Sequence, residues 1–171
     1  EAILAHTHID VSAWRKIDEV PFDFERRRVS VLLERAGERR LFVKGSPEDV
    51  LRLCTQYEDA GALHPLDDAA RERILALVEE LSRNGFRVLG VAWRQTPPQQ
   101  DHAVVTDESE LVFSGFAAFL DPPKASAAPA LAALAASGVA VKIVSGDNEL
   151  VARYICDKLN VPISGALNGG D

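Results

Sequence analysis

Residues 42–48 read Phe42-Val43-Lys44-Gly45-Ser46-Pro47-Glu48, so that a β-prone run passes through a glycine into the start of a helix. Serine is a good helix cap, proline suits the first helical position, and acidic residues favour the positive end of the helix dipole. The stretch therefore predicts a strand, a tight turn and a helix that extends to about Tyr57. Lys44 beside free backbone amides would suit an anion, and a simple capped turn explains the same residues equally well.

A sheet is expected around this strand. Upstream, residues 14–24 have the apolar spacing of an extended segment, which Pro21 places near an edge. The β-prone runs 29–33 and 40–43 are joined by Ala36-Gly37-Glu38, which suits a hairpin turn. Downstream, the hydrophobic periodicity predicts an amphipathic helix over residues 67–82, followed by strands over 86–93 and 111–120.

The composition of the chain changes after Leu120. Asp121-Pro122-Pro123-Lys124 ends the strand and stiffens the chain, which indicates a domain junction or a rigid linker. An alanine-rich helix is expected over residues 125–136, ended by Ser137-Gly138. The β-branched run 139–144 predicts a buried parallel strand, followed by Ser145-Gly146-Asp147 and a helix over 148–159. Open α/β sheets bind phosphate at such loops, although an aspartate that only caps the helix is at least as common.

The bulk composition excludes several classes of protein. The 171 residues are 47% hydrophobic and 26% charged, and the net charge of −7 argues against nucleic acid as a partner. No apolar run is long enough to cross a membrane. Cys54 and Cys156 are expected to be buried thiols, and no residues have metal-ligand spacing. The lack of methionine, and a helix end expected over residues 1–9, favour a piece excised from a longer protein.

Two further motifs each have a functional and a plain interpretation. Phe22 followed by Arg26-Arg27-Arg28 suits a stacked base and its phosphates. Judged alone, this motif is better explained as a core phenylalanine beside a solvated basic strand end. Asn84-Gly85-Phe86-Arg87-Val88-Leu89 brings an arginine to the start of a strand, and a surface arginine is the default interpretation there.

The joint order of these motifs resembles the P-type ATPase family over nearly the whole chain. The runs 19–30 and 119–124 are most similar to the bacterial magnesium-transporting members. The resemblance implies an α+β nucleotide-binding domain, with an antiparallel sheet flanked by helices, over residues 1–120. It implies that residues 121–171 form a hinge and a partial phosphorylation domain, which is an α/β segment of the haloacid-dehalogenase type.

The resemblance also assigns roles to individual residues. Phe22 would stack on adenine, Lys44 would form the floor of the pocket, and Gly45 would let the nucleotide approach. The remaining residues that would contact ATP are Arg27, Arg87, Leu89, Ser145, Gly146 and Asp147, and Asp121, Pro122, Pro123 and Lys124 would form the interdomain hinge. Ser46 and Ser145 stand where the family commonly has alanine and threonine. A family acid falls at Glu1 or just before it.

The implied activity is ATP hydrolysis coupled to cation transport, with magnesium as the expected ion. In the family an aspartate in an Asp-Lys-Thr-Gly-Thr loop attacks the γ-phosphate, and a Gly-Asp-Gly loop holds Mg²⁺. Both motifs are missing from this sequence. The expected cofactor is therefore ATP as Mg-ATP, with metal ligands mostly outside residues 1–171 and no turnover by this piece alone. The expected partners are ATP or ADP and the remaining domains of a pump in a bacterial inner membrane, whose cytoplasmic part this piece would form.

Three alternatives remain open from the sequence. The first is a P-type ATPase that transports another cation such as calcium, because ion selectivity lies in membrane helices. A freestanding haloacid-dehalogenase phosphatase would suit residues 139–147, but it requires an amino-terminal Asp-x-Asp that is missing here. A non-catalytic interaction domain could have kept the fold and lost nucleotide binding, although the retention of Phe22, Lys44 and Arg87 argues against this.

Overall fold

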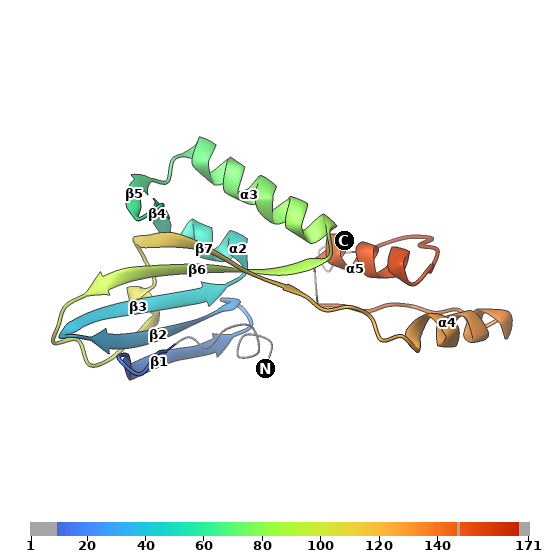
Figure 1. Ribbon diagram of the computed structural model, residues 1–171, viewed down its shortest axis with the longest axis horizontal. Coiled ribbons are helices and arrows are strands. Elements are labelled where there is room, and N and C mark those ends of the chain that lie inside the picture. The colour runs from blue at the N-terminus through green and yellow to red at the C-terminus, as the bar shows by residue number, and fades with distance from the viewer. Residues whose placement is uncertain (1–9, 147, 168–171) are drawn as a thin grey trace. The chain divides into compact units, whose positions relative to one another are not determined.

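The computed structural model describes residues 10–146 and 148–167, and the chain divides into two compact units (Figure 1). The first unit comprises Glu1–Leu75 and Val88–Ala117, and the second comprises Ala76–Arg87 and Ala118–Asp171. One helix and two strands contribute residues to both units, so the division does not fall at a single point of the chain.

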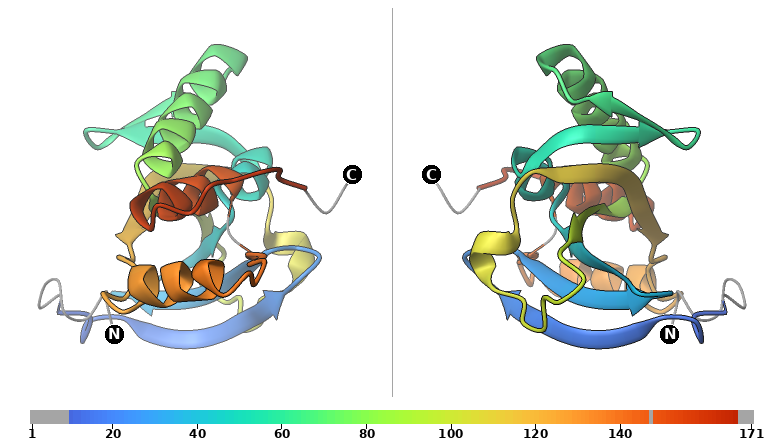
Figure 2. Two further views of the ribbon diagram at one scale, coloured as in Figure 1. Left: turned by 90° about the vertical axis from the view of Figure 1, so that its right-hand side faces the viewer. Right: turned by 90° about the vertical axis from the view of Figure 1, so that its left-hand side faces the viewer.

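A seven-stranded sheet dominates the first unit, with strands in the order β1-β2-β3-β6-β7-β4-β5. The strands are β1 (Arg15–Asp23), β2 (Arg28–Arg35), β3 (Glu38–Gly45), β4 (Cys54–Asp59), β5 (Ala62–Pro65), β6 (Phe86–Thr96) and β7 (Leu111–Leu120). Figure 2 shows β1 at one edge and the β4–β5 hairpin at the other. The pairs β1–β2, β2–β3, β3–β6 and β4–β5 are antiparallel, whereas β4 and β7 are parallel. The sheet is therefore mixed, and not wholly antiparallel as expected.

The hairpin between β2 and β3 confirms the turn expected at Ala36-Gly37. Both residues have positive φ, 51° and 82°, which matches the twist of a two-residue hairpin loop. The pairing then continues without a bulge from Arg35↔Glu38 to Arg28↔Gly45. This unbroken register brings the start of β2 beside the end of β3, where Lys44 and Gly45 lie.

The helix after β3 is much shorter than expected. α2 spans Pro47–Arg52, with proline in its first turn and Ser46 as its cap. The expectation of a helix to Tyr57 is wrong, because residues 54–59 form β4. Cys54 is buried and pairs with Leu111 of β7, whose amide donates to the Leu53 carbonyl at 2.9 Å. Tertiary pairing thus outweighs the local helical pattern, and it also creates β5, which was not expected.

The core lies on one face of the sheet, where α2 and the start of α3 (Asp68–Arg83) pack. It contains Leu32, Leu41 and Val43 from the sheet, Val50 and Leu51 from α2, and Leu66, Ala70, Ala92, Leu111 and Phe113. Arg71 of α3 donates hydrogen bonds to the carbonyls of Leu51 and Cys54, which provides partners for two carbonyls at and just after the end of α2. Burial raises the pKa of the Cys54 thiol to about 12, so this thiol is protonated at neutral pH. Cys54 and Cys156 are both free and buried, as expected.

The second unit contains α4 (Ala127–Ala136) and α5 (Glu149–Lys158). Gly138, at φ 73°, follows the end of α4, and the Asn148 side chain caps α5 by accepting from the Leu150 amide at 2.9 Å. The strand expected over residues 139–144 is wrong: this segment is irregular, and Val144 is 96% exposed. A β-branched run becomes a parallel strand only when neighbouring strands accept its backbone bonds, and no described strand pairs with it. No helix among the described residues is long and apolar enough to cross a membrane.

The start of α3 provides a test of the fold. The Asp67 carboxylate accepts a hydrogen bond from the Ala70 amide at 2.7 Å and so caps the helix, whereas Asp68 only contributes charge to the first turn. We expect Asp67→Ala to lower the free energy of unfolding by about 1 kcal/mol. Asp68→Ala removes the same charge and should lower it by less than about 0.5 kcal/mol. Urea denaturation followed by circular dichroism measures both values, and equal losses would contradict the cap.

Candidate functional site

The face of the sheet opposite the core carries an exposed cation in a row of aliphatic side chains. Lys44 pairs with Val29 of β2 on one side and with Val91 of β6 on the other. Side chains alternate along a strand, so the buried Val43 and Gly45 face the core while Lys44 faces away from it and is exposed. Leu89 lies two residues before Val91 and therefore on the same face. The site has an apolar floor with one lysine ammonium group on it.

Phe22 lies near the end of β1, where its ring is open to solvent. Its exposed fraction is 55%, and its one described ring contact is an edge-to-face contact with Phe24 at 5.2 Å between centroids and 86° between planes. Phe24 is itself 89% exposed. The interpretation of Phe22 as a core residue is therefore wrong. An exposed ring of this kind can stack against a planar base.

The arginine cluster after Phe24 divides between two environments. Arg26 donates from Nη1 to both oxygens of the Glu108 carboxylate at 2.7 and 2.9 Å, and Arg28 donates from Nε to the same group at 2.6 Å. Arg27, between them, has φ 51° and a side chain that is 62% exposed. The pattern of three consecutive arginines suggested a shared role in phosphate binding. The structure instead uses two of them internally and leaves Arg27 facing solvent.

Glu108 was not found by the sequence analysis, and it is the most completely buried charged group of this region. Its side chain has 0% exposure, and the hydroxyl of Ser30 donates a further hydrogen bond to it. Burial by itself raises the pKa of Glu108, but the hydrogen bonds from Ser30, Arg28 and Arg26 outweigh it and hold the pKa below its usual value. A signal for it was present in the sequence: Ser30 interrupts an otherwise apolar strand, as a partner of a buried polar group would.

The turn that joins β1 to β2 is held by hydrogen bonds on both sides of Arg27. Arg26 donates from Nη2 to the Pro21 carbonyl at 2.6 Å, and Arg28 donates from Nη1 to the Arg26 carbonyl at 3.0 Å. The Asp23 carboxylate accepts from the amides of Glu25 and Arg26 at 2.8 and 2.9 Å. The backbone that carries Phe22 and Arg27 is therefore constrained along its length.

Gly45 allows this turn to pack directly on β3. The Ser46 amide donates to the Arg27 carbonyl at 3.2 Å. A Cβ atom at Gly45 would lie 2.5 Å from the Arg27 carbonyl oxygen and 2.6 Å from the Arg28 Cβ. Real Cβ atoms do not approach backbone this closely, so the absence of a side chain at Gly45 is required by the turn itself. The same contact places the Arg27 backbone beside Gly45 and Ser46.

The start of α2 is occupied by its own side chains. The Ser46 hydroxyl accepts from the Asp49 amide at 3.3 Å and lies 2.7 Å from the Asp49 carboxylate, and Arg27 Nη1 is 3.8 Å from that carboxylate. This geometry supports the capped-turn interpretation of residues 44–49. The amides at the start of α2 are therefore not available to an anion. The exposed side chains of Lys44 and Arg27 are the cations that an anion could contact here.

The remaining expected site residues lie in the second unit or outside the described residues. Arg87 is an exposed residue near the start of β6, and residues 121–124 form the irregular segment between β7 and α4. Ser145 and Gly146 lie in the exposed loop before α5. Asp147 and the N-terminal acid at or before Glu1 lie outside the described residues. The structure therefore brings the backbones of Arg27, Lys44, Gly45 and Leu89 close together, with Phe22 on β1, the strand next to β2.

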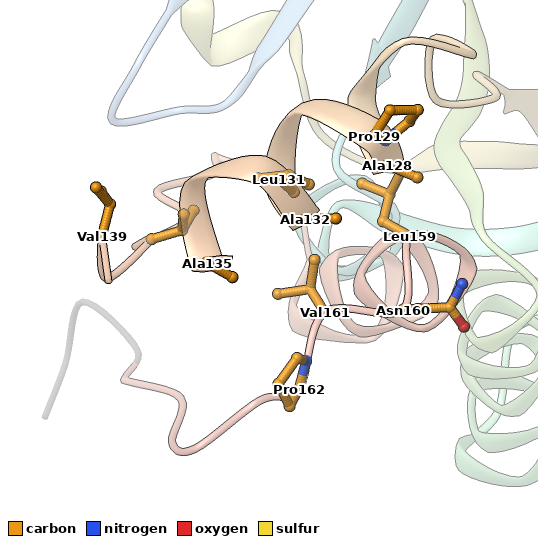
Figure 3. A pocket seen from close by; sticks show the side chains of 11 residues that line it. Ala128, Pro129, Leu131, Ala132, Ala135, Val139, Leu159, Asn160, Val161 and Pro162 are labelled. Carbon is orange, nitrogen blue, oxygen red and sulfur yellow. The ribbon is translucent and has the colours of Figure 1, made fainter. Parts of the chain in front are cut away.

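None of these residues lines the two cavities described in the structure. A cavity of about 480 Å³ in the second unit lies between α4 and residues 159–162 and is almost wholly apolar (Figure 3). A groove of about 310 Å³ in the first unit is lined by Gln56, Leu63, Trp93, Arg94, Gln95, Glu110 and Val112. Among the described residues, no group of three or more His, Cys, Asp or Glu could hold a metal ion.

The chain matches a known family over most of its length. The model of the family described as "P-type ATPase, cytoplasmic domain N" matches residues 5–126. The chain therefore belongs to the P-type ATPase family and contains its cytoplasmic domain N, which agrees with the mixed sheet and its helices.

Individual proteins of the family differ in how similar they are to this chain. The chain is 44% identical to "Magnesium-transporting ATPase, P-type 1" of Salmonella typhimurium LT2, over 92% of the chain and 18% of that protein. The identity to the protein of the same name in Escherichia coli K12 is also 44%, over 94% of the chain and 18% of the relative. "Calcium-transporting ATPase 1" of Lactococcus lactis is 28% identical over 91% of the chain. The chain thus spans 18% of the length of the magnesium-transporting relatives.

Gly45→Ala tests the packing of the turn on β3. We expect the free energy of unfolding to fall by about 1–3 kcal/mol or more, because the new Cβ displaces the Arg27 backbone. Gly165→Ala is the matched control, since no atom lies within 4 Å of its Cβ position, and it should change the value by less than about 0.5 kcal/mol. Urea denaturation gives both values. A harmless Gly45→Ala would show that the turn does not close on the strand.

Acid should remove the contribution that the Glu108 ion pairs make to the free energy of unfolding. The pKa of Glu108 is lowered in the folded protein from its usual value of 4.5. The stability that its carboxylate contributes is therefore complete above pH 4.5 and is lost as the pH falls below that value. We expect Glu108→Gln to lower the free energy of unfolding by about 3–5 kcal/mol at pH 7. The difference between the wild type and this variant should shrink as pH falls from about 5 to 3. Denaturation curves across this range measure it, and a difference that does not vary with pH would contradict the assignment.

Proposed function

We propose that the chain binds ATP for a magnesium-transporting P-type ATPase and orients it for phosphorylation of an aspartate elsewhere in the longer protein. The observations that support this proposal are two exposed cations, Lys44 near the end of β3 and Arg27 in the β1–β2 turn, and the solvent-exposed ring of Phe22 near the end of β1. An exposed planar ring and two exposed cations match the two parts of a nucleotide, which offers a base for stacking and negative charge on its phosphates.

In this proposal, aromatic and aliphatic side chains bind the base and sugar of the nucleotide, and cationic side chains bind its phosphates. Phe22 stacks on adenine, and the apolar residues around Lys44, including Leu89, form the floor under the base and sugar. Lys44 and Arg27 attract the phosphates. The nucleotide enters as Mg-ATP, in which the metal spreads the charge of the triphosphate, and most ligands of that metal come from outside this chain. Domain N therefore contributes position and orientation to phosphoryl transfer.

The proposal assigns the interdomain hinge and further phosphate contacts to residues of the second unit. Residues 121–171 belong to a phosphorylation domain of the haloacid-dehalogenase type, and the nucleotide-binding domain extends over residues 1–120. Asp121 to Lys124 act as the hinge, Arg87 contacts phosphates, and Ser145, Gly146 and Asp147 meet the terminal phosphate when the domains close.

Magnesium is proposed as the transported ion because the relatives at 44% identity carry that name, whereas a calcium-transporting relative is 28% identical. The complete protein is proposed to reside in the inner membrane of a bacterium, with this chain on the cytoplasmic side. Its partners are ATP, ADP and the other domains of the pump.

Nucleotide titration tests the proposed function. We expect millimolar ATP, ADP and AMP to shift the backbone amide signals of Phe22, Lys44 and their neighbours in isotope-labelled protein, without release of phosphate. Phe22→Ala should weaken binding about tenfold, because stacking of a base contributes about 1–3 kcal/mol. Ser46→Ala is the control, since position 46 shapes the turn and contributes no stacking.

The outcomes separate nucleotide binding from other roles. If no nucleotide perturbs these signals, the binding proposal fails and a non-catalytic interaction domain becomes the better assignment. If Phe22→Ala and Ser46→Ala weaken binding equally, nucleotide still binds but Phe22 does not stack on its base.

A further inference from the structure

Glu108 connects a distant loop to the turn that carries the proposed nucleotide site. It follows η1 (Val105–Asp107), and its side-chain hydrogen bonds go to Arg26, Arg28 and Ser30, which precede it by 78–82 residues in the chain. Each of these partners lies in β2 or in the turn before it. Glu108 therefore acts at the exact point where the chain reverses between Phe22 and Val29.

Both arginines that bind Glu108 also bind the backbone next to the proposed ligand residues. Arg26 donates to the carbonyl of Pro21, the residue before Phe22. Arg28 donates to the carbonyl of Arg26, the residue before Arg27. Without the carboxylate, two largely buried guanidinium groups would lack a counter-charge. Such groups reorient toward water, and these two backbone hydrogen bonds would be lost with them.

The backbone at Arg27 makes this turn sensitive to the loss. A non-glycine residue with φ 51° is in the left-handed region, which costs about 1–2 kcal/mol relative to ordinary backbone. That conformation persists because the bonds on either side of it are fixed. When they are released, the turn can relax, and Arg27 and Phe22 no longer have a single orientation.

The loop that carries Glu108 is itself well anchored. Arg94 of β6 donates from Nη1 to the carbonyls of Asp107 and Ser109 at 3.3 and 3.0 Å. The Asp107 carboxylate accepts from the Gln100 side chain and the Val104 amide, both at 2.9 Å. Glu108 is therefore held firmly within the first unit, so loss of its carboxylate would release the turn and leave the loop in place.

We propose that Glu108 is a positioning residue for nucleotide binding: through Arg26 and Arg28 it holds the β1–β2 turn in the conformation that presents Phe22 and Arg27 to the ligand. The inference rests on the proposed function, because it concerns the same site. It adds a residue that contacts no nucleotide and yet sets the affinity.

The test compares ADP affinity with stability in matched variants of this chain. Glu108→Gln should weaken ADP binding about tenfold, because only a fraction of molecules would keep the competent turn. It should also shift the amide signals of Phe22 and Arg27 in the free protein. Glu34→Gln is the control: it removes a carboxylate that pairs with Arg15 and Arg39 at the other end of β2. Its ADP affinity should stay within about twofold of the wild type.

Two further variants separate positioning from a general loss of stability. Leu66→Ala removes core packing away from the turn, and folded Leu66→Ala should bind ADP within about twofold of the wild type. In a double-mutant cycle, Arg28→Gln should weaken binding in the wild type and add little in Glu108→Gln, because both substitutions release the same turn. If Glu108→Gln does not fold, Ser30→Ala removes one bond to the carboxylate and should weaken ADP binding about threefold.

The results distinguish the two proposals. A wild type that binds no ADP overturns the proposed function. A wild type that binds ADP, with Glu108→Gln or Ser30→Ala equally tight, overturns only the positioning role. The same holds if Glu108→Gln and Leu66→Ala lose affinity in proportion to their loss of stability, since Glu108 would then act through the fold alone.

Discussion

The buried carboxylate of Glu108, with Arg26, Arg28 and Ser30 around it, is the interaction on which the site depends. A buried charge is tolerated only when it is paired and hydrogen-bonded, and here two guanidinium groups and a hydroxyl meet both oxygens. The pairing joins a loop before β7 to the turn between β1 and β2. Because the two arginines also bind the backbone of that turn, one electrostatic centre fixes a local conformation that the sequence of the turn would not adopt alone.

The same centre determines which charges the protein offers to a ligand. The chain has a net charge of −7, so an anion can bind only where cations are concentrated and exposed. Arg26 and Arg28 are neutralised internally, and Asp49 lies near Arg27. Of the cations close to the β1–β2 turn and the end of β3, Lys44 and Arg27 remain exposed. A local site of this kind can hold a nucleotide without making the whole surface attractive to polyanions.

The family assignment and the geometry support each other while resting on different residues. The match to domain N extends over residues 5–126, which includes the whole seven-stranded sheet. The geometry of the candidate site depends on a few close contacts within this sheet, above all the approach of the Arg27 backbone to Gly45. Glycine there is explained by packing of the turn, so its presence does not require a ligand. The magnesium-transporting relatives, of which the chain covers 18% of the length, bear on the complete protein rather than on this site.

The sequence by itself determined the local elements whose causes are local. Turn residues at Ala36-Gly37, the cap and proline of α2, and the apolar periodicity of α3 each act within a few residues, so β2, β3, α3, β6, β7, α4 and α5 were expected close to their observed positions. Only the tertiary structure decided that residues 54–59 form a strand, because their partner β7 lies more than 50 residues further along the chain. Only the tertiary structure separated Arg27 from its neighbours, because the partner of those neighbours is a carboxylate that no short-range pattern connects to them.

Residues 139–144 show that a local pattern can also predict an element that does not form. A β-branched run favours a strand, but the strand requires neighbouring strands that accept its hydrogen bonds.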